Sequence, residues 1–255
     1  MGCTKKMHAF LTAVAVVCLA LAFCLANYMD KRIRVPTTFI NLDRRADRKT
    51  HCEEQLNPVL KHVHRLSAVD GSKIDVTADK RVKLFYDLQE NYRWDKSIRM
   101  FASRKMTTGE VGCCLSHRNV WERIARNKDK LHLICEDDVV VLPDFHRVMS
   151  ELVVPADCDI MYLGYIHPGA DAIGESVSDN VHRVKFLFGG YGYMLTSKGV
   201  SKLLKISPID RPLDNFLGKL TEDGVMTGYA VVPPIMEQLE YGGVGSDIKH
   251  SAHTV

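Results

Sequence analysis

The stretch "LHLICEDDVVVLPDF", residues 131–145, decides the fold class of this chain. An apolar run leads directly into Glu136, Asp137 and Asp138, and a second apolar run follows at once. Three adjacent carboxylates repel one another, and beside an apolar core they are costly unless positive charge neutralises them. The first run predicts a buried strand, so the acids are expected where a central strand ends.

Other apolar stretches predict the remaining strands of the sheet. Residues 37–42 are apolar and β-branched, residues 62–71 end in a turn, and residues 159–165 are almost wholly apolar. Residues 184–196, "VKFLFGGYGYMLT", predict a strand interrupted by glycines. These strands alternate with helical stretches, which predicts an α/β fold with a mostly parallel sheet flanked by helices on both faces.

The predicted helices begin at recognisable capping residues. One follows the first strand and runs to about Leu56; Thr107 and Glu110 have capping-box spacing at the start of the second. Ser197 is expected to cap the third, and residues 72–105 are expected to form a long, partly helical connection over a site. The second helix is expected to bury one face, which comprises Cys114, His117, Trp121, Ile124 and Ala125.

Composition and charge exclude one class of function. The chain has 255 residues, of which 46% are hydrophobic and 25% charged, and its formal net charge is +3. Lys5 and Lys6 lie at the N-terminus, so the remainder carries a net charge of only +1. A near-neutral body argues against general nucleic-acid binding.

The N-terminal segment predicts a membrane anchor. Residues 9–26 are apolar except for one threonine, which is long enough to span a bilayer. The predicted organisation is therefore a tail at 1–8, a transmembrane signal-anchor at 9–27, a stem at 28–36 and a catalytic domain at 37–255. The alternative is a cleaved signal peptide and a secreted enzyme, because "ALA" at 20–22 fits a cleavage site. The flanking positive charges leave the orientation open.

The acidic triplet predicts a metal site. Side chains at i and i+2 of an extended segment point the same way, so Glu136 and Asp138 are able to share one divalent cation. Such a cation leaves positions open for phosphate oxygens, as Mg²⁺ and Mn²⁺ do with nucleotides. The alternative is a solvated acidic turn.

Basic residues and a histidine are further candidates for this site. Arg44, Arg45 and Arg48 follow the first strand and are able to meet phosphates, or else form a solvated helix start. His117 lies on the apolar face of its helix, where either a hydrogen-bonded core residue or a site group fits the pattern.

Six stretches occur together in one order, and together they resemble glycosyltransferase family 25. They are "FINLDRRADR", "SAVDG", "TTGEVGCCLSH", "LICEDDV", "GGYGYMLTSKG" and "RPLDNFL", and the resemblance covers about residues 37–248. The family includes lipopolysaccharide and collagen hydroxylysine galactosyltransferases. It implies a Rossmann-like domain of the glycosyltransferase A type, a nucleotide-sugar donor such as a UDP-hexose, a Mn²⁺-type ion and inversion at the anomeric carbon.

The resemblance also implies roles for individual residues. Metal binding falls to Glu136 and Asp138. Contacts with the donor fall to Asn41, Asp43, Arg44, Arg48, Ser116, His117 and Asp137. The chain departs from the family pattern at Cys114, where alanine is more usual, and in having room for only one such domain.

The proton acceptor of an inverting transfer is the last role to fill. A carboxylate near the acceptor hydroxyl is the usual choice, and metal-bound acids are poor bases. Asp210 and Asp214 in "PIDRPLDNF" are the candidates, and Asp214 fits the family's P-L-D better. The alternative is that Asp214 caps a helix starting at Asn215.

These features predict a membrane-anchored, metal-dependent inverting glycosyltransferase that moves a hexose, galactose being one candidate, to a hydroxyl of a glycan or protein. The chain is expected to be a single-pass membrane protein with a lumenal catalytic domain. In a eukaryote its expected location is the endoplasmic reticulum or Golgi. A catalytically silent binding or adhesion protein is the alternative. A phosphoryl-transfer enzyme or nuclease fits less well, because the chain has neither a Gly-x4-Gly-Lys-Ser/Thr loop nor a basic excess.

Overall fold

The computed structural model describes residues 16–17, 31–87, 103–166 and 169–239. Its centre is an eight-stranded sheet with the strand order β2-β1-β5-β10-β7-β11-β9-β8. The strands are β1 (Thr37–Asn41), β2 (Val63–Ser67), β5 (Leu131–Glu136), β7 (Ile160–Ile166), β8 (Ile173–Ser178), β9 (Val181–Val184), β10 (Phe188–Thr196) and β11 (Gly228–Val231).

Strand direction confirms the predicted mostly parallel sheet. Parallel pairing joins β1 to both β2 and β5, and β7 to β11. Antiparallel pairing joins β10 to β5 and β7, β9 to β11, and β8 to β9. Six of the eight strands therefore share one direction, and only β9 and β10 run against it.

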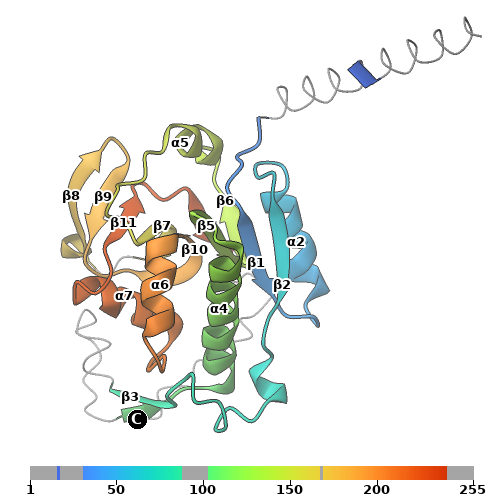
Figure 1. Cartoon of the computed structure of the whole chain (residues 1–255), viewed down its shortest axis with the longest axis vertical. Helices are drawn as coiled ribbons and strands as arrows, with labels where there is room; N and C mark the ends of the chain where they lie inside the picture. The colour runs from blue at the N-terminus through green and yellow to red at the C-terminus, as the bar shows by residue number, and fades with distance from the viewer. Residues whose placement is uncertain (1–15, 18–30, 88–102, 167–168, 240–255) are drawn as a thin grey trace, which may run out of the picture.

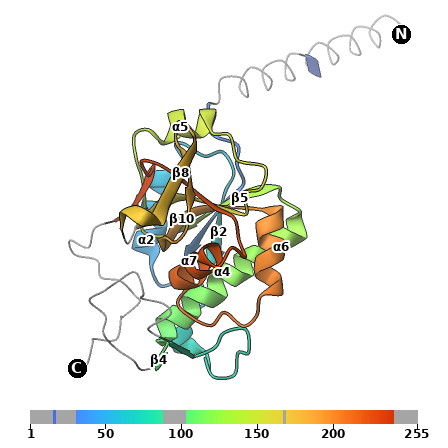
Figure 2. The same ribbon diagram turned by 90° about the vertical axis from the view of Figure 1, so that its left-hand side faces the viewer.

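Helices cover both faces of this sheet (Figures 1 and 2), as the alternating pattern predicts. The helices are α2 (Ala46–Leu56), α4 (Thr108–Asn127), α5 (Phe145–Glu151), α6 (Ser197–Lys205) and α7 (Leu213–Glu222). Neighbouring residues of β5 and of β10 enter different cores: Ile134 and Tyr193 pack with α4, α6 and α7, whereas Leu133 and Met194 pack with α2 and α5. The short elements are η1 (Gly71–Lys73), η2 (Ala170–Ala172), β3 (Phe85–Asp87) with β4 (Ser103–Lys105), and β6 (Val139–Val141) with β12 (Met236–Gln238).

Two local predictions need correction, and a third is tested only in part. The N-cap of α6 is Thr196, whose hydroxyl accepts from the Gly199 N–H, and not Ser197, which is the first helical residue. Ala125 of α4 is exposed, because the buried stripe ends at Ile124. Within the predicted connection at 72–105, the described residues form the end of the 3-10 helix Gly71–Lys73, turns and the β3–β4 pair; residues 88–102 lie outside the described part of the chain, so a helix there stays a prediction.

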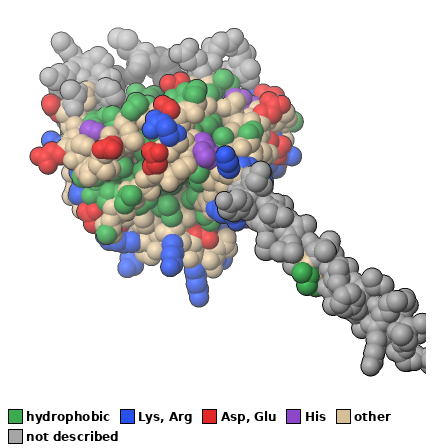
Figure 3. Space-filling model, turned by 90° about the horizontal axis from the view of Figure 1, so that it is seen from above, with side chains coloured by type: hydrophobic (Ala, Val, Ile, Leu, Met, Phe, Trp, Pro, Cys, Tyr) green, Lys and Arg blue, Asp and Glu red, His purple; other side chains and the backbone are tan. Residues whose placement is uncertain are grey.

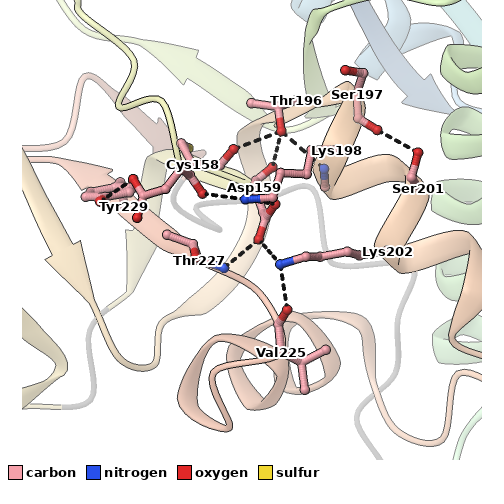
Figure 4. A network of polar contacts seen from close by, with 12 residues as sticks. Cys158, Asp159, Thr196, Ser197, Lys198, Ser201, Lys202, Val225, Thr227 and Tyr229 are labelled. Atoms are coloured by element: carbon pink, nitrogen blue, oxygen red, sulfur yellow. Dashed lines mark hydrogen bonds and ion pairs between the residues drawn. The ribbon is translucent and has the colours of Figure 1, made fainter.

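A buried carboxylate fixes α6 to the sheet (Figure 4). Asp159 is fully buried immediately before β7, where its Oδ2 accepts from Lys202 Nζ at 2.5 Å and from the Thr227 N–H at 2.8 Å. Thr196 donates to the Cys158 carbonyl in the same network. The ion pair thus joins the helix to β7 and to the segment that leads into β11.

We expect Asp159→Ala to lower the free energy of unfolding by about 3 kcal/mol, measured in urea. Breaking a buried pair costs about 3–5 kcal/mol, and the lower end applies because the Lys202 side chain remains 33% exposed. Asp157→Ala is the matched control. Its carboxylate is 56% exposed and pairs with Arg183, so about 1 kcal/mol or less should be lost. Equal losses in the two variants would contradict the role given to Asp159.

The N-terminal anchor falls outside what the structure tests. Apart from Val16 and Val17, the predicted span at 9–27 lies among the residues that are not described. Within the described ranges, no helix has the length and apolar character needed to cross a bilayer. Figure 3 shows acidic and basic side chains interspersed over one face of the body, in keeping with its near-neutral charge.

Candidate active site

A pocket of about 530 Å³ opens at the carboxyl ends of the parallel strands. Residues that follow or end β1, β2, β5 and β7 line it, together with the amino ends of α4 and α7. The chain places β2 on one side of β1 and β5 on the other, so the strand order reverses at this point. Ligands of open α/β sheets bind at such a reversal, outside the carboxyl ends of the strands.

The acidic triplet lies in this pocket, as the sequence predicts. Glu136 is the last residue of β5, and Asp137 and Asp138 form the turn before β6. All three line the pocket. The three carboxylates nevertheless have different partners, which separates their roles.

Asp137 anchors the turn. Its Oδ2 accepts from Asn41 Nδ2 at 2.7 Å, and its Oδ1 accepts from Arg48 at 3.0 Å. Burial raises the pKa of Asp137, while the hydrogen bond from Asn41 and the charge of Arg48 act in the opposite direction. Both carboxylate oxygens are engaged within the protein, so Asp137 holds the end of β5 against β1 and α2.

Asp138 and Glu136 face different neighbours. Asp138 Oδ2 accepts from Gln238 Nε2 at 3.0 Å and lies 3.6 Å from Arg48. Glu136 Oε1 lies 3.4 Å from His117 Nε2. Burial is the main cause of the raised pKa of Glu136. The adjacent His117 acts in the opposite direction, and the neighbouring Asp138 and Asp137 raise the pKa further.

The acidic turn fits an oxygen-liganded divalent cation. Arg48 pairs with Asp137 at 3.0 Å and lies 3.6 Å from Asp138, whereas Glu136 lies beside His117. Glu136 and Asp138 supply hard oxygen ligands of the kind that Mg²⁺ and Mn²⁺ prefer. The raised pKa of Glu136 reflects mainly the cost of burying its charge.

We expect Glu136→Gln to raise the melting temperature of the metal-free protein at pH 7–8. The pKa of Glu136 is raised in the folded state. At a pH below the ordinary glutamate pKa of about 4.3, the carboxyl group is protonated in both the folded and the unfolded state, so it does not affect stability. At a pH above the raised folded-state pKa, the carboxylate is charged and destabilises the folded state. The melting temperature should rise by about 2–4 °C for each 1 kcal/mol that the substitution adds to the free energy of unfolding. The difference between the two proteins should vanish near pH 4.

Calorimetry in the presence of chelator measures this difference. Glu151→Gln is the control, because that side chain is 67% exposed. A Glu136→Gln protein that melts at or below the wild-type temperature at neutral pH would contradict the raised pKa.

A tight contact between backbones builds one wall of the pocket. A Cβ at Gly71 would lie 1.8 Å from the Thr108 carbonyl oxygen, and one at Gly112 would lie 2.6 Å from that of Val69. Ser116 Oγ donates to the Gly112 carbonyl and accepts from the Val69 N–H. The glycines of "VDG" and "GEVG" thus let the turn after β2 lie directly on α4, and Ser116 fastens it there.

The glycine segment of β10 forms the opposite wall. Gly189 has φ +85°, a conformation that favours glycine. A Cβ at Gly190 would approach Leu213 Cδ2 at 3.1 Å and Glu136 Oε1 at 3.4 Å. These residues therefore keep the space beside the Glu136 carboxylate open.

Asp214 reaches the pocket, whereas Asp210 is not among its lining residues. Asp210 pairs with Arg211 at 2.9 Å. Asp214 lies in the first turn of α7, where its Oδ1 accepts from the Asn215 N–H at 2.7 Å. Its proposed alternative role as the cap of a helix starting at Asn215 is wrong in detail, because α7 begins at Leu213 and Pro212 is the N-cap.

The other predicted donor-binding residues divide into two groups. Arg44, Ser116 and His117 line the pocket with Arg48. Asn41 lies behind it through its bond to Asp137, and the exposed Asp43 instead accepts from Arg65 and Ser67, which lowers its pKa.

Sequence reasoning missed several residues that line the pocket, among them Cys113 and Gln238. The signal for Cys113 is its position one helical turn before His117, which places both on one side of α4. Gln238 arrives from β12, about 100 residues after Asp138, and no local pattern indicates that contact.

Residues 35–169 match the family model described as glycosyltransferase family 25 (LPS biosynthesis protein), more than half of the chain. The chain belongs to glycosyltransferase family 25. The matched region of this family 25 chain contains β1, β2, α4 and the acidic turn, and ends just after β7.

Curated relatives agree with this assignment. A "Glycosyltransferase 25 family member" of Anopheles gambiae is 30% identical over 192 residues, which cover 70% of this chain and 30% of that protein. One of Drosophila melanogaster is 29% identical over 188 residues, covering 70% and 29%. Human "Procollagen galactosyltransferase 2" is 27% identical over 200 residues, covering 75% and 31%. The family 25 chain thus spans about a third of the length of these relatives.

Proposed function

We propose that this chain is a metal-dependent inverting glycosyltransferase. It would transfer a hexose from a nucleotide diphosphate sugar, such as a UDP-hexose, to a hydroxyl group of a glycan or protein. The observation that carries the proposal is the acidic turn at the end of β5, which faces a pocket at the strand-order reversal. The relative named as a galactosyltransferase supports galactose as the transferred sugar. Because the match covers only about a third of that relative, both the sugar and the acceptor are part of the proposal.

The pocket suits a nucleotide sugar in size and in charge pattern. Its volume of about 530 Å³ lies in the range of small-molecule sites, about 300–1,000 Å³. A divalent cation held by Glu136 and Asp138 would neutralise the diphosphate as it leaves. Arg44 lines the same pocket and is placed to meet phosphate oxygens.

The remaining chemistry falls to residues of the chain. An acceptor hydroxyl loses its proton as its oxygen attacks the anomeric carbon, and a nearby carboxylate takes that proton. Asp214 lines the pocket from α7, across from the β10 glycines, and is the proposed base. Asp137 and Arg48 hold the acidic turn in position through their ion pair.

Donor hydrolysis across a panel of nucleotide sugars, with and without Mn²⁺, tests this function. We expect one UDP-hexose to be hydrolysed in a Mn²⁺-dependent way, and added chelator to abolish the reaction. A chain that binds donors but turns over none of them would instead support a catalytically silent binding protein.

We also propose that residues 9–27 anchor the enzyme in a membrane with its catalytic domain in a secretory lumen. The apolar run of residues 9–26 supports this. Protease added to sealed microsomes should leave the body intact until detergent is added. Digestion without detergent would contradict the orientation, and a mature N-terminus near Phe23 or Asn27 would indicate a cleaved signal peptide.

A further inference from the structure

Three ligand-type side chains meet on the floor of the pocket, and only one of them belongs to the pair expected to bind Mn²⁺. Cys113 and His117 come from successive turns of α4, and Glu136 comes from the end of β5. Their ligand atoms all lie within 4.8 Å of one another. A thiol, an imidazole and a carboxylate together form a mixed ligand set. Such a set suits zinc-type ions better than it suits Mg²⁺ or Mn²⁺, which favour oxygen ligands.

His117 provides an independent sign that a ligand is missing here. Its side chain is only 1% exposed, yet its Nε2 has no hydrogen-bond partner among the described residues. That atom lies 3.4 Å from Glu136 Oε1. Two ligands on one tetrahedral zinc ion, at about 2.0–2.2 Å from the metal, stand about 3.3 Å apart. The pair therefore already has the separation that a shared ion requires.

The second ring nitrogen of His117, Nδ1, has the kind of hydrogen-bond partner that a metal-binding histidine needs. His117 Nδ1 lies 2.8 Å from the Tyr193 hydroxyl, which also accepts from Trp121 Nε1 at 3.1 Å. A metal-binding histidine usually donates its second N–H to such a partner, which fixes the ring and the tautomer. With Nδ1 donating to Tyr193, the lone pair of Nε2 points towards Glu136 and Cys113.

We propose that Cys113, His117 and Glu136 form a binding site for Zn²⁺ on the pocket floor, with a fourth position open to the pocket. On binding, the Cys113 S–H bond breaks, its proton passes to solvent, and the thiolate sulfur binds the ion. The five cysteines of the described residues are all free, so Cys113 is available as a thiol.

The site has a regulatory consequence that rests on the proposed function. Glu136 is a ligand of this ion and also of the Mn²⁺-type ion expected beside Asp138, so a Glu136 carboxylate turned towards His117 and Cys113 to bind Zn²⁺ is drawn away from Asp138. Zn²⁺ therefore inhibits the Mn²⁺-dependent transferase by withdrawing Glu136 from the donor side of the pocket.

Metal titration of the full-length chain tests the site without donor or turnover. Co²⁺, used as a spectroscopic substitute, should give a sulfur-to-metal charge-transfer band and visible bands of tetrahedral intensity. Cys113→Ala should abolish the charge-transfer band and weaken Zn²⁺ binding by about 10²-fold or more, since even loss of a ligand's hydrogen-bond partner costs about 10–100-fold. Cys158→Ala, at another buried cysteine far along the chain, should change neither.

The outcomes separate this inference from the proposed function. No charge-transfer band in the wild type, or one that survives in Cys113→Ala and in the near-isosteric Cys113→Ser, overturns the site. Zn²⁺ affinity that does not fall as Mn²⁺ is added overturns the sharing of Glu136. A chain that hydrolyses donor but shows no band refutes only the zinc site, whereas a chain with the band that hydrolyses no donor refutes only the transferase.

Discussion

Asp138→Asn should lower transferase turnover by about 10²–10³-fold and weaken the affinity for both Mn²⁺ and donor. The substitution keeps the shape of the side chain and an oxygen that accepts from Gln238, so the turn should persist. It removes one of the two carboxylates that we propose as metal ligands. Charge stabilisation by a bound metal is worth several kcal/mol in the transition state, and each 1.36 kcal/mol is tenfold in rate.

Initial rates against donor and Mn²⁺ concentration measure this loss, and thermal unfolding checks that the fold is intact. Asp144→Asn is the matched control: its carboxylate is 66% exposed, lies in the same segment and pairs only at the surface with Arg147. The control should retain full activity. Wild-type turnover in excess chelator, or an Asp138→Asn enzyme with unchanged Mn²⁺ dependence, would rule out the metal role.

The parts of the site that the sequence could predict are those with local signals. The acids at the end of β5, the capping box Thr107–Glu110 and the alternation of strands and helices each occur within a few residues. Local patterns also locate the carboxyl end of the sheet, because strand ends follow directly from where apolar runs stop.

What the sequence could not predict depends on contacts between distant segments. Asp137 has the same chemistry as its neighbours, and only the approach of Asn41 and Arg48 gives it the anchoring role. The antiparallel insertion of β10 between β5 and β7 likewise depends on long-range pairing. Propensity carries no information about either.

The same limit explains the outcome for His117. A histidine on an apolar helix face fits both a core residue and a site residue, and the structure makes it both. Its Nδ1 side belongs to the core through Tyr193, and its Nε2 side faces Glu136 on the pocket floor.

Asp214→Asn should lower turnover by about 10²-fold or more, with donor binding and melting temperature nearly unchanged. That is the size of a general-base contribution, and an amide cannot accept the proton. Asp214 lines the pocket, and its charge is close enough to help raise the pKa of the Cys113 thiol on the pocket floor.

A purely structural role predicts a different result for the same change. An acid in the first turn of a helix stabilises it by about 0.3–1 kcal/mol through the helix dipole, and Asn would lose only that. Asp210→Asn is the control, because Asp210 pairs with Arg211 and does not line the pocket. Steady-state rates should fall for Asp214→Asn and not for Asp210→Asn, while the pH-rate profile of the slow variant loses its acidic limb. If Asp214→Asn keeps a near-wild-type rate, the base must be another group of the pocket, and a large loss in Asp210→Asn would direct the search to that loop.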